Sequence, residues 1–188
     1  MLKFVMAGVA GLVVASSAQA AAPAGGRAEA IVGWDKNDIS QGGVSLDSDG
    51  VVFGIGLGYD FAIGTTASLG VDVEASESTA NFSATGGGAS AKLSAGRDLY
   101  AGARATFALS ERANLYFKAG YTNARVKGSA TVGGTTSSAS ANADGIRGGA
   151  GVQFMLSSKM YVGGEYRYSN YEGDYSRHQV VGTVGFRF

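Results

Sequence analysis

The sequence predicts an all-β protein: an eight-stranded antiparallel up-and-down barrel that crosses a membrane. Three observations lead to this prediction. Short stretches alternate apolar and polar residues with a period of two, ionisable residues in them keep to one face, and the connections are alternately short and long. The 188 residues include 31 Gly and one Pro, which suits strands whose backbones approach closely.

The N-terminus has the three parts of a secretory signal peptide. Lys3 supplies the positive charge, residues 4–15 are apolar, and Ala18-Gln19-Ala20 forms a small-x-small cleavage site. The apolar part is shorter than the roughly 20 residues that a transmembrane helix needs. We therefore expect export and cleavage after Ala20. The expected division is a signal peptide over residues 1–20, a lead-in over 21–26 and a barrel domain over 27–188.

Eight stretches of the mature chain alternate in the manner of half-buried strands. The second is the most regular, because apolar residues occupy every odd position from Val51 to Phe61. The last ends the chain with aromatic residues on one parity, at Phe186 and Phe188. In order, the stretches cover residues 28–34, 51–61, 67–74, 99–107, 115–122, 146–154, 160–168 and 178–188.

Charge distinguishes the two faces of these stretches. The apolar face carries no Asp, Glu, Lys or Arg, and the other face carries five acids and five bases. They are Glu29, Asp60, Asp72, Glu74, Arg104, Lys118, Arg147, Glu165, Arg167 and Arg187. A soluble barrel or sandwich would place charges outside, whereas Lys or Arg at a bilayer midplane costs about 2–4 kcal/mol. We therefore expect an apolar exterior and a paired, structural charge network inside the barrel.

The connections indicate which end of the barrel carries loops. They are a few residues long after the second, fourth and sixth stretches and much longer after the first, third and fifth, as in outer-membrane barrels. The long connections, over residues 35–50, 76–97 and 127–144, are the candidate sites for a surface partner. The second and third are rich in Ser, Gly, Ala and Thr, which predicts flexible loops.

Several functional classes lack support in the composition. Cys is absent, so the chain has no disulfide, thiolate metal site or thiol nucleophile. The formal net charge is zero and no basic stretch is interleaved with aromatics, which argues against nucleic acid as a partner. Asp47 and Asp49 resemble a fragment of a Ca²⁺ loop but lack its Gly and distal Glu. We expect no catalytic, cofactor or metal site.

Two motifs carry a family resemblance: Arg97-Asp98-Leu99-Tyr100-Ala101-Gly102-Ala103-Arg104 and the terminal Val184-Gly185-Phe186-Arg187-Phe188. The whole mature chain resembles the small eight-stranded outer-membrane barrels of Gram-negative bacteria, the opacity-type and OmpA-like or porin-family proteins. The resemblance implies a place in the outer membrane, among its lipids and lipopolysaccharide. It also implies that the barrel-assembly machinery reads the terminal strand through Val184, Phe186 and Phe188.

Three functions are compatible with this architecture. The favoured one is a structural, adhesion or envelope-interaction protein with a plugged interior and surface loops. A narrow porin-like channel is the alternative, although eight strands leave an interior just wide enough for side chains. A barrel enzyme that modifies lipid A is more remote, because His178 is the only His and no His-x-Ser pair is present, Ser176 preceding it by two. We expect the protein not to be an enzyme.

Overall fold

The structure is a computed structural model, and it describes residues 20–41, 44–173 and 175–188. The signal-peptide prediction lies almost wholly outside these residues. The described part holds no helix long and apolar enough to span a membrane. Its strands are β1 (Gly25–Gln41), β2 (Val44–Ala62), β3 (Ala67–Ser78), β4 (Asn81–Gly86), β5 (Ala89–Ala108), β6 (Ala113–Val132), β7 (Thr135–Met155), β8 (Met160–Tyr171) and β9 (Tyr175–Arg187).

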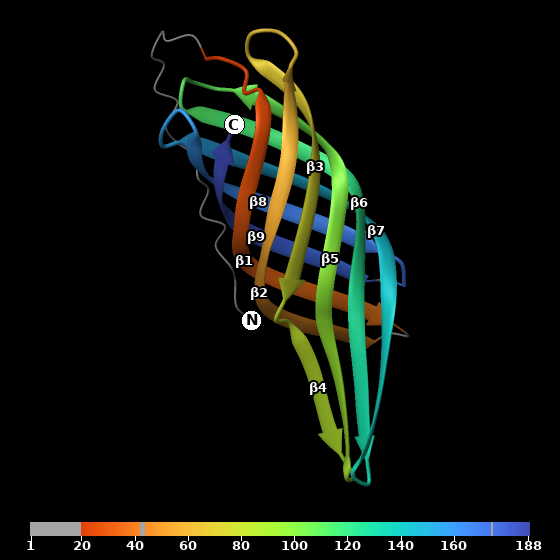
Figure 1. The fold of residues 1–188 in the computed structure, drawn as a ribbon. Helices are drawn as coiled ribbons and strands as arrows, with labels where there is room; N and C mark the ends of the chain where they lie inside the picture. The colour runs from red at the N-terminus through yellow and green to blue at the C-terminus, as the bar shows by residue number, and fades with distance from the viewer. Residues whose placement is uncertain (1–19, 42–43, 174) are drawn as a thin grey trace, which may run out of the picture.

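The strands close into a barrel (Figure 1). Each pairs antiparallel with its neighbour in the order β1-β2-β3-β5-β6-β7-β8-β9, and β9 pairs with β1. The closing ladder runs from Arg27 opposite Arg187 to Ile39 opposite Tyr175. β4 lies outside this ring, paired with β5 beyond the end of β3. The prediction of an eight-stranded antiparallel up-and-down barrel is therefore confirmed.

The two faces of the barrel wall are sorted as the alternation predicts. On the outside, apolar side chains are exposed, with Ile55 at 64% and Ile146 at 71% of their surface. On the inside, charged and polar side chains are buried, and Arg167 has no exposed surface. Because successive strand residues point to opposite faces, one strand supplies both environments. The arrangement is that of a protein with lipid outside and a polar interior.

The short connections gather at one end of the barrel, with the C-terminus and the start of β1 (Figure 1). The β2–β3 turn covers residues 63–66, and Gly64 within it has φ of +99°. This is the left-handed region, where a residue without Cβ is unstrained. β1 begins at Gly25, so its ladder reaches two residues into the expected lead-in over 21–26.

Most residues of the three long connections are paired strand, so the prediction that the second and third are flexible loops is wrong. β1 and β2 remain paired as far as Gln41 and Val44. The other two connections become hairpins whose two-residue turns are Gly87-Gly88 and Gly133-Gly134. All four glycines have positive φ, as a type I′ turn requires of both central residues. The loops predicted over 76–97 and 127–144 are therefore ordered β-structure.

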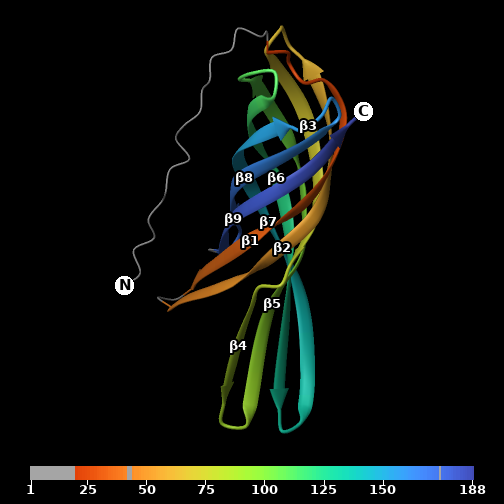
Figure 2. The same cartoon turned by 90° about the vertical axis from the view of Figure 1, so that its left-hand side faces the viewer.

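These two hairpins form a sheet that projects beyond the barrel (Figures 1 and 2). We call it the distal sheet: β4, residues 89–95 of β5, 125–132 of β6 and 135–143 of β7, paired in that order. It joins the barrel wall at a β-bulge in β5, between Ala95 and Asp98. In Figure 2 it extends downward from the barrel, while the end of β1 and the start of β2 diverge to one side.

Candidate functional site: a filled lumen and a distal sheet

Among the described residues, the lumen holds fourteen buried Asp, Glu, Lys and Arg side chains, seven acids and seven bases, which we call the lumen network. All ten side chains predicted for the interior belong to it and are at most 8% exposed. The other four are Arg27, Asp35, Asp98 and Arg177. Sequence reasoning placed these four outside the eight stretches or left them out of the network. Continuing the period-two pattern past the assumed strand ends would have found them, since Arg27 and Asp35 share the parity of Glu29.

Nearest the short turns, Arg27 from β1 contacts two acids on neighbouring strands. Its Nη1 lies 2.5 Å from Oδ1 of Asp60, and its Nη2 contacts Asp72. Asp60 also accepts a hydrogen bond of 2.7 Å from Nη1 of Arg187, on the last strand. The group therefore joins β9, β1, β2 and β3 from inside the lumen.

Glu29 lies next along the lumen and accepts hydrogen bonds from three directions. Its Oε1 takes one of 3.3 Å from Arg104 Nη1, one of 2.6 Å from the Tyr161 hydroxyl and one of 3.2 Å from Gln153 Nε2. The donors come from β5, β8 and β7, none of which is paired with β1. The contacts therefore cross the lumen rather than follow its wall.

The middle of the lumen contains a group of two acids and two bases. Lys118 Nζ contacts Glu74 and lies 2.9 Å from Glu165 Oε1. Arg167 donates from Nε to Glu165 Oε1 at 2.6 Å, and its Nη1 lies 3.0 Å from Glu74 Oε2. The Tyr116 hydroxyl donates to Glu165 Oε2 at 2.7 Å. Each charge thus faces opposite charges, which offsets the cost of burying it.

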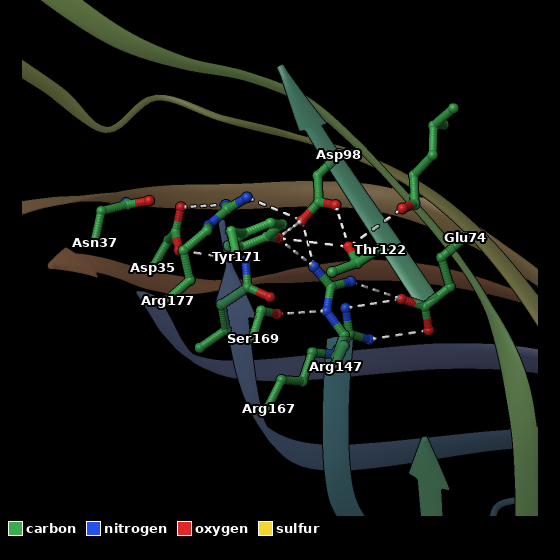
Figure 3. Close-up of polar contacts among 12 residues, drawn as sticks. Asp35, Asn37, Glu74, Asp98, Thr122, Arg147, Arg167, Ser169, Tyr171 and Arg177 are labelled. Atoms are coloured by element: carbon green, nitrogen blue, oxygen red, sulfur yellow. Dashed lines mark hydrogen bonds and ion pairs between the residues drawn. The ribbon is translucent and has the colours of Figure 1, made fainter. Parts of the chain in front are cut away.

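Toward the distal sheet, Asp98 is the centre of the contacts drawn in Figure 3. Its carboxylate contacts Arg147 and accepts hydrogen bonds of 2.9 Å from Arg177 Nη1, 3.0 Å from the Tyr171 hydroxyl and 2.6 Å from the Thr122 hydroxyl. The sequence resemblance placed Asp98 in a family motif but gave it no interior role. Here it is bound to four strands at once.

Interior tyrosines occupy space that glycines leave open. Tyr161 lies opposite Gly185 and Tyr116 opposite Gly151 on paired strands. A Cβ added to Gly151 would lie 2.6 Å from the Tyr116 ring, and one on Gly185 would overlap the Tyr161 ring. With five arginines among the largest fully buried side chains, the lumen is filled by protein. Eight strands leave room for little else.

At the end of the barrel that carries the distal sheet, each barrel strand has an outward polar residue beyond its apolar exterior. We call these eight residues the rim ring. They are Lys36, Asp49, Glu77, Arg97, Asn123, Asp144, Asn170 and His178. Aromatic residues such as Trp34, Tyr121 and Tyr168 precede the ring on their strands, as in the girdles of membrane barrels. Hydrogen bonds of 2.5 Å from Tyr121 and Asn123 lower the pKa of the Asp144 carboxyl.

His178, the residue considered for catalysis, lies on the outer surface of β9 within the rim ring. Its Nδ1 is 2.7 Å from the Tyr166 hydroxyl, and its ring centroid is 4.9 Å from that of Tyr168. Ser176 is two positions away on the same strand. These contacts describe a His held between girdle aromatics.

The three residues of the expected assembly signal lie on the exterior. Val184, Phe186 and Phe188 are 52%, 44% and 73% exposed. The backbone of Phe188 exchanges two hydrogen bonds of 3.0 Å with Gly26, one in each direction. The terminal aromatic therefore also completes the ladder between the last strand and the first.

The distal sheet has a polar outer face that carries three cations, Lys92, Arg125 and Lys127. Arg125 donates from Nη2 to the Ser140 hydroxyl at 2.8 Å, across the β6–β7 pair. Threonine hydroxyls at positions 131 and 136 make a 2.8 Å hydrogen bond on the same face. Such cross-strand contacts stabilise a sheet that has water on this side.

A comparison of the sequence with known families agrees with the barrel architecture described above. Residues 7–188 match the family described as outer membrane protein beta-barrel domain. The chain belongs to this family. As a member of the outer membrane protein beta-barrel domain family it is a protein of the bacterial outer membrane, as expected. No curated protein matches the chain.

Solved structures show the same fold in other members of this architecture. The attachment invasion locus protein Ail of Yersinia pestis is similar with a TM-score of 0.57 and 18% identity, over 87% of this chain and 99% of that chain. Neisserial surface protein A, NspA, gives a TM-score of 0.57 and 18% identity over 87% of this chain and 97% of that chain. At these identities the likeness concerns the fold.

Proposed function

We propose that this protein is a surface-display barrel, which anchors the distal sheet in the outer membrane and holds it outside the cell to contact partners. The observation that carries the proposal is the continuation of the barrel wall, beyond the rim ring, into four paired strands that turn at Gly87-Gly88 and Gly133-Gly134. Loops serving only to join strands need few residues. Ordered strands of this length present a defined surface.

The lumen network favours display over transport. A porin-like path needs a continuous water-filled lumen, but buried side chains cross this one at each level from Arg27 to Asp98. Opening the lumen would separate charges that are paired in a water-poor environment, at a cost of several kcal/mol. A lumen filled in this way suits a barrel that anchors the distal sheet rather than one that conducts solutes.

The exterior supports two further partners. Outer-membrane lipid, including lipopolysaccharide, surrounds the apolar exterior, and the rim ring lies at the level of its polar groups. The assembly machinery of the outer membrane recognises the terminal strand through Val184, Phe186 and Phe188, which point outward where another protein reaches them.

An adhesive role for the displayed sheet is supported by two features. Ail, whose name describes attachment and invasion, has been crystallised with the heparin analogue sucrose octasulfate. The outer face of the distal sheet here presents Lys92, Arg125 and Lys127 within a surface of hydroxyl groups. Exposed cations of this kind attract sulfated polysaccharides. Heparin is therefore a suitable first probe.

The topology is testable with introduced cysteines, because the chain has none of its own. Ser90→Cys places a thiol near the tip of the distal sheet, and Ser158→Cys places one in a short turn at the opposite end. On intact cells a membrane-impermeant maleimide should label Ser90→Cys and leave Ser158→Cys unlabelled until the cells are opened. The reverse pattern would overturn the proposal.

The display role is testable by shortening the sheet. Removal of residues 82–93 and 128–139, combined with Arg125→Ala and Lys127→Ala, deletes the distal part of the sheet and all three cations while keeping the barrel strands. We expect the shortened protein to retain heat-modifiable migration and to lose cell binding to a heparin-coated surface or cultured cells. Steady, large single-channel steps from the intact protein in a planar bilayer would instead favour a channel.

A further inference from the structure

The distal sheet has an inner face that differs from its polar outer face. The inner positions of its four strands are Ala, Gly, Val, Leu or Phe, except for Thr135 and Ser137 at the tip of β7. Val126 packs against a cluster that includes Tyr175 at the mouth of the lumen. Phe82 and Leu93 line a small hollow with the same two residues. The inner face therefore continues the lumen side of the wall, with the polarity reversed.

The bulge in β5 produces this reversal. On the barrel side of the bulge, the even-numbered residues Asp98 and Tyr100 face the lumen. Between Ala95 and Asp98, β5 has one residue more than β6. On the distal side of the bulge, the odd-numbered residues of β5 therefore face inward. Without the extra residue, Lys92 would point inward and Leu93 outward. The bulge thus keeps the inner face free of charge and places the cation on the outer face.

The inner face is apolar in a region that water should surround. Val132 is 64% exposed and Leu93 is 39% exposed. Exposed apolar surface of this extent marks a contact site for another molecule. Alanine and glycine make the surface flat, so it suits a second flat surface better than a small ligand.

We infer that the inner face of the distal sheet binds the same face of a second copy of this chain that stands in an opposing membrane. The inference rests on the proposed display function and names a partner for it. Two identical copies meeting through their outer faces would oppose Lys92, Arg125 and Lys127 with like charges, which is unfavourable. Meeting through their inner faces opposes only uncharged residues.

The geometry favours opposing membranes over neighbouring positions in one membrane. The inner face looks toward the axis of its own barrel, because it continues the lumen side of the wall. Two copies standing side by side could join these faces only if their barrels occupied the same space. A copy that is inverted, and projects from a facing membrane, lays its sheet against the first with both barrels clear of each other.

The area buried by one pair of inner faces is small, so the contact depends on many pairs binding together. A face about 7 residues long and four strands wide, at about 3.3 Å per residue and about 4.8 Å per strand, covers about 450 Å². A pair then buries about 900 Å², below the roughly 1,200–2,000 Å² of stable complexes. One pair is weak, but many pairs between two membranes bind tightly through multivalency. The contact therefore holds cells or vesicles together without forming stable dimers in detergent.

The test uses the full-length mature protein in phospholipid vesicles, with vesicle association followed by turbidity and light scattering. Wild-type vesicles should associate with one another. Ala130→Lys puts a charge on the inner face, and Thr131→Lys puts the same charge on the outer face of the same strand. We expect association to slow by about tenfold or more for Ala130→Lys and to change little for Thr131→Lys, because like charges then oppose each other only at the inner faces.

Mixing provides the decisive control. Vesicles with Ala130→Lys and vesicles with Ala130→Glu should each stay dispersed alone and associate when mixed, because opposite charges meet. Heat-modifiable migration and Trp34 fluorescence establish that each variant is folded. A partner of another kind would not restore association in the mixture.

Three results would overturn the inference: dispersed wild-type vesicles, equal effects of the two lysine variants, or no recovery on mixing. If wild-type vesicles bind an apolar dye at the inner face but stay dispersed, the face holds a small apolar ligand instead. Ser90→Cys labelling on intact cells remains positive in each of these cases if the display function is correct. Its failure would overturn the display function itself.

Discussion

Asp35 and Arg177 form a two-pronged ion pair across the closure of the barrel. Nη2 of Arg177 lies 2.6 Å from Oδ2 of Asp35, and its Nε donates to Oδ1 at 3.2 Å (Figure 3). Asp35 belongs to the first strand and Arg177 to the last, so the pair joins the two ends of the chain. Both side chains are almost fully buried. A parallel pair of hydrogen bonds fixes orientation as well as distance.

Asp35→Ala should therefore destabilise the barrel. Removing one partner of a buried pair leaves the other charge uncompensated, which costs about 3–5 kcal/mol. Arg177 keeps its contact with Asp98, so we expect the lower end of this range. Urea unfolding in lipid vesicles measures the change through Trp34, the only Trp of the chain. Asp49→Ala, at an exposed position of the rim ring, is the control, and equal midpoints for the two variants would contradict a stabilising role for the Asp35–Arg177 pair.

Gly185→Ala should weaken the fold although it adds an apolar methyl group. The new Cβ would overlap the ring of Tyr161, and forced overpacking costs about 1–3 kcal/mol. Gly182→Ala lies on the outward face of the same strand, with its nearest contact at 3.8 Å, and should be close to neutral. Unfolding midpoints of the two variants make the comparison. A stability for Gly185→Ala equal to that of Gly182→Ala would mean that Tyr161 yields freely.

Truncation of two central arginines should open the lumen. Arg147 and Arg167 are among the largest fully buried side chains, and replacing both by Ala removes much of the material that fills it. We expect low conductance from the wild type in planar bilayers and a several-fold increase from the double variant. Arg125→Ala with Lys127→Ala removes two cations outside the lumen and serves as the control. No gain over that control would show that water does not follow the vacated path.

A charge on the exterior should be costly in proportion to its depth. Leu57→Arg, on the lipid-facing side of β2, should lower the free energy of unfolding by about 2–4 kcal/mol. Asp49→Arg, on the same strand within the rim ring, should cost about 0–1 kcal/mol. Unfolding from lipid vesicles compares the two. Equal costs would indicate that Leu57 does not face the bilayer core.

Loss of the terminal aromatics should prevent assembly. Deletion of residues 186–188 removes the hydrogen bonds between Phe188 and Gly26 and leaves the closing ladder short. Unpaired strand edges are not tolerated in lipid, so we expect little folded protein in the outer membrane. Fractionation and heat-modifiable migration report the result, with Leu156→Ala in a short turn as control. A stable barrel from the truncated chain would be incompatible with this role.

The sequence predicted the fold where lipid and lumen impose opposite requirements on alternate residues. Val51 to Phe61 could only alternate as it does because one face meets lipid and the other meets charge. The predicted stretches end next to Arg27, Asp35 and Asp98 because the adjacent outward positions hold Gly26, Lys36 and Arg97 rather than apolar side chains. In a barrel with a polar lumen, a charge of the right parity is instead a sign of continuation.

The partners within the lumen network could not be predicted. Asp98 and Arg147 are 49 residues apart and meet only because the β5–β6 and β6–β7 pairings fix how far these strands are shifted. The distal sheet was missed for a different reason. The distal sheet is in contact with water or a partner instead of lipid, so its strands consist largely of Ser, Thr and Ala and lack a strong alternation of apolar and polar residues. The pairs Gly87-Gly88 and Gly133-Gly134 are nevertheless typical of hairpin turns.

When the chain folds, its charged residues leave water for the lumen and its apolar residues come into contact with lipid. Charged residues make up only 16% of the chain, against about 25% in typical soluble proteins, and most of those in the barrel strands face the lumen. Before closure, the fourteen charges of the lumen network are open to water. Closure withdraws them from water and presents Leu57, Ile55 and their neighbours to lipid. The same residues are thus in contact with water before the chain inserts into the membrane and connect the strands from inside the lumen afterwards.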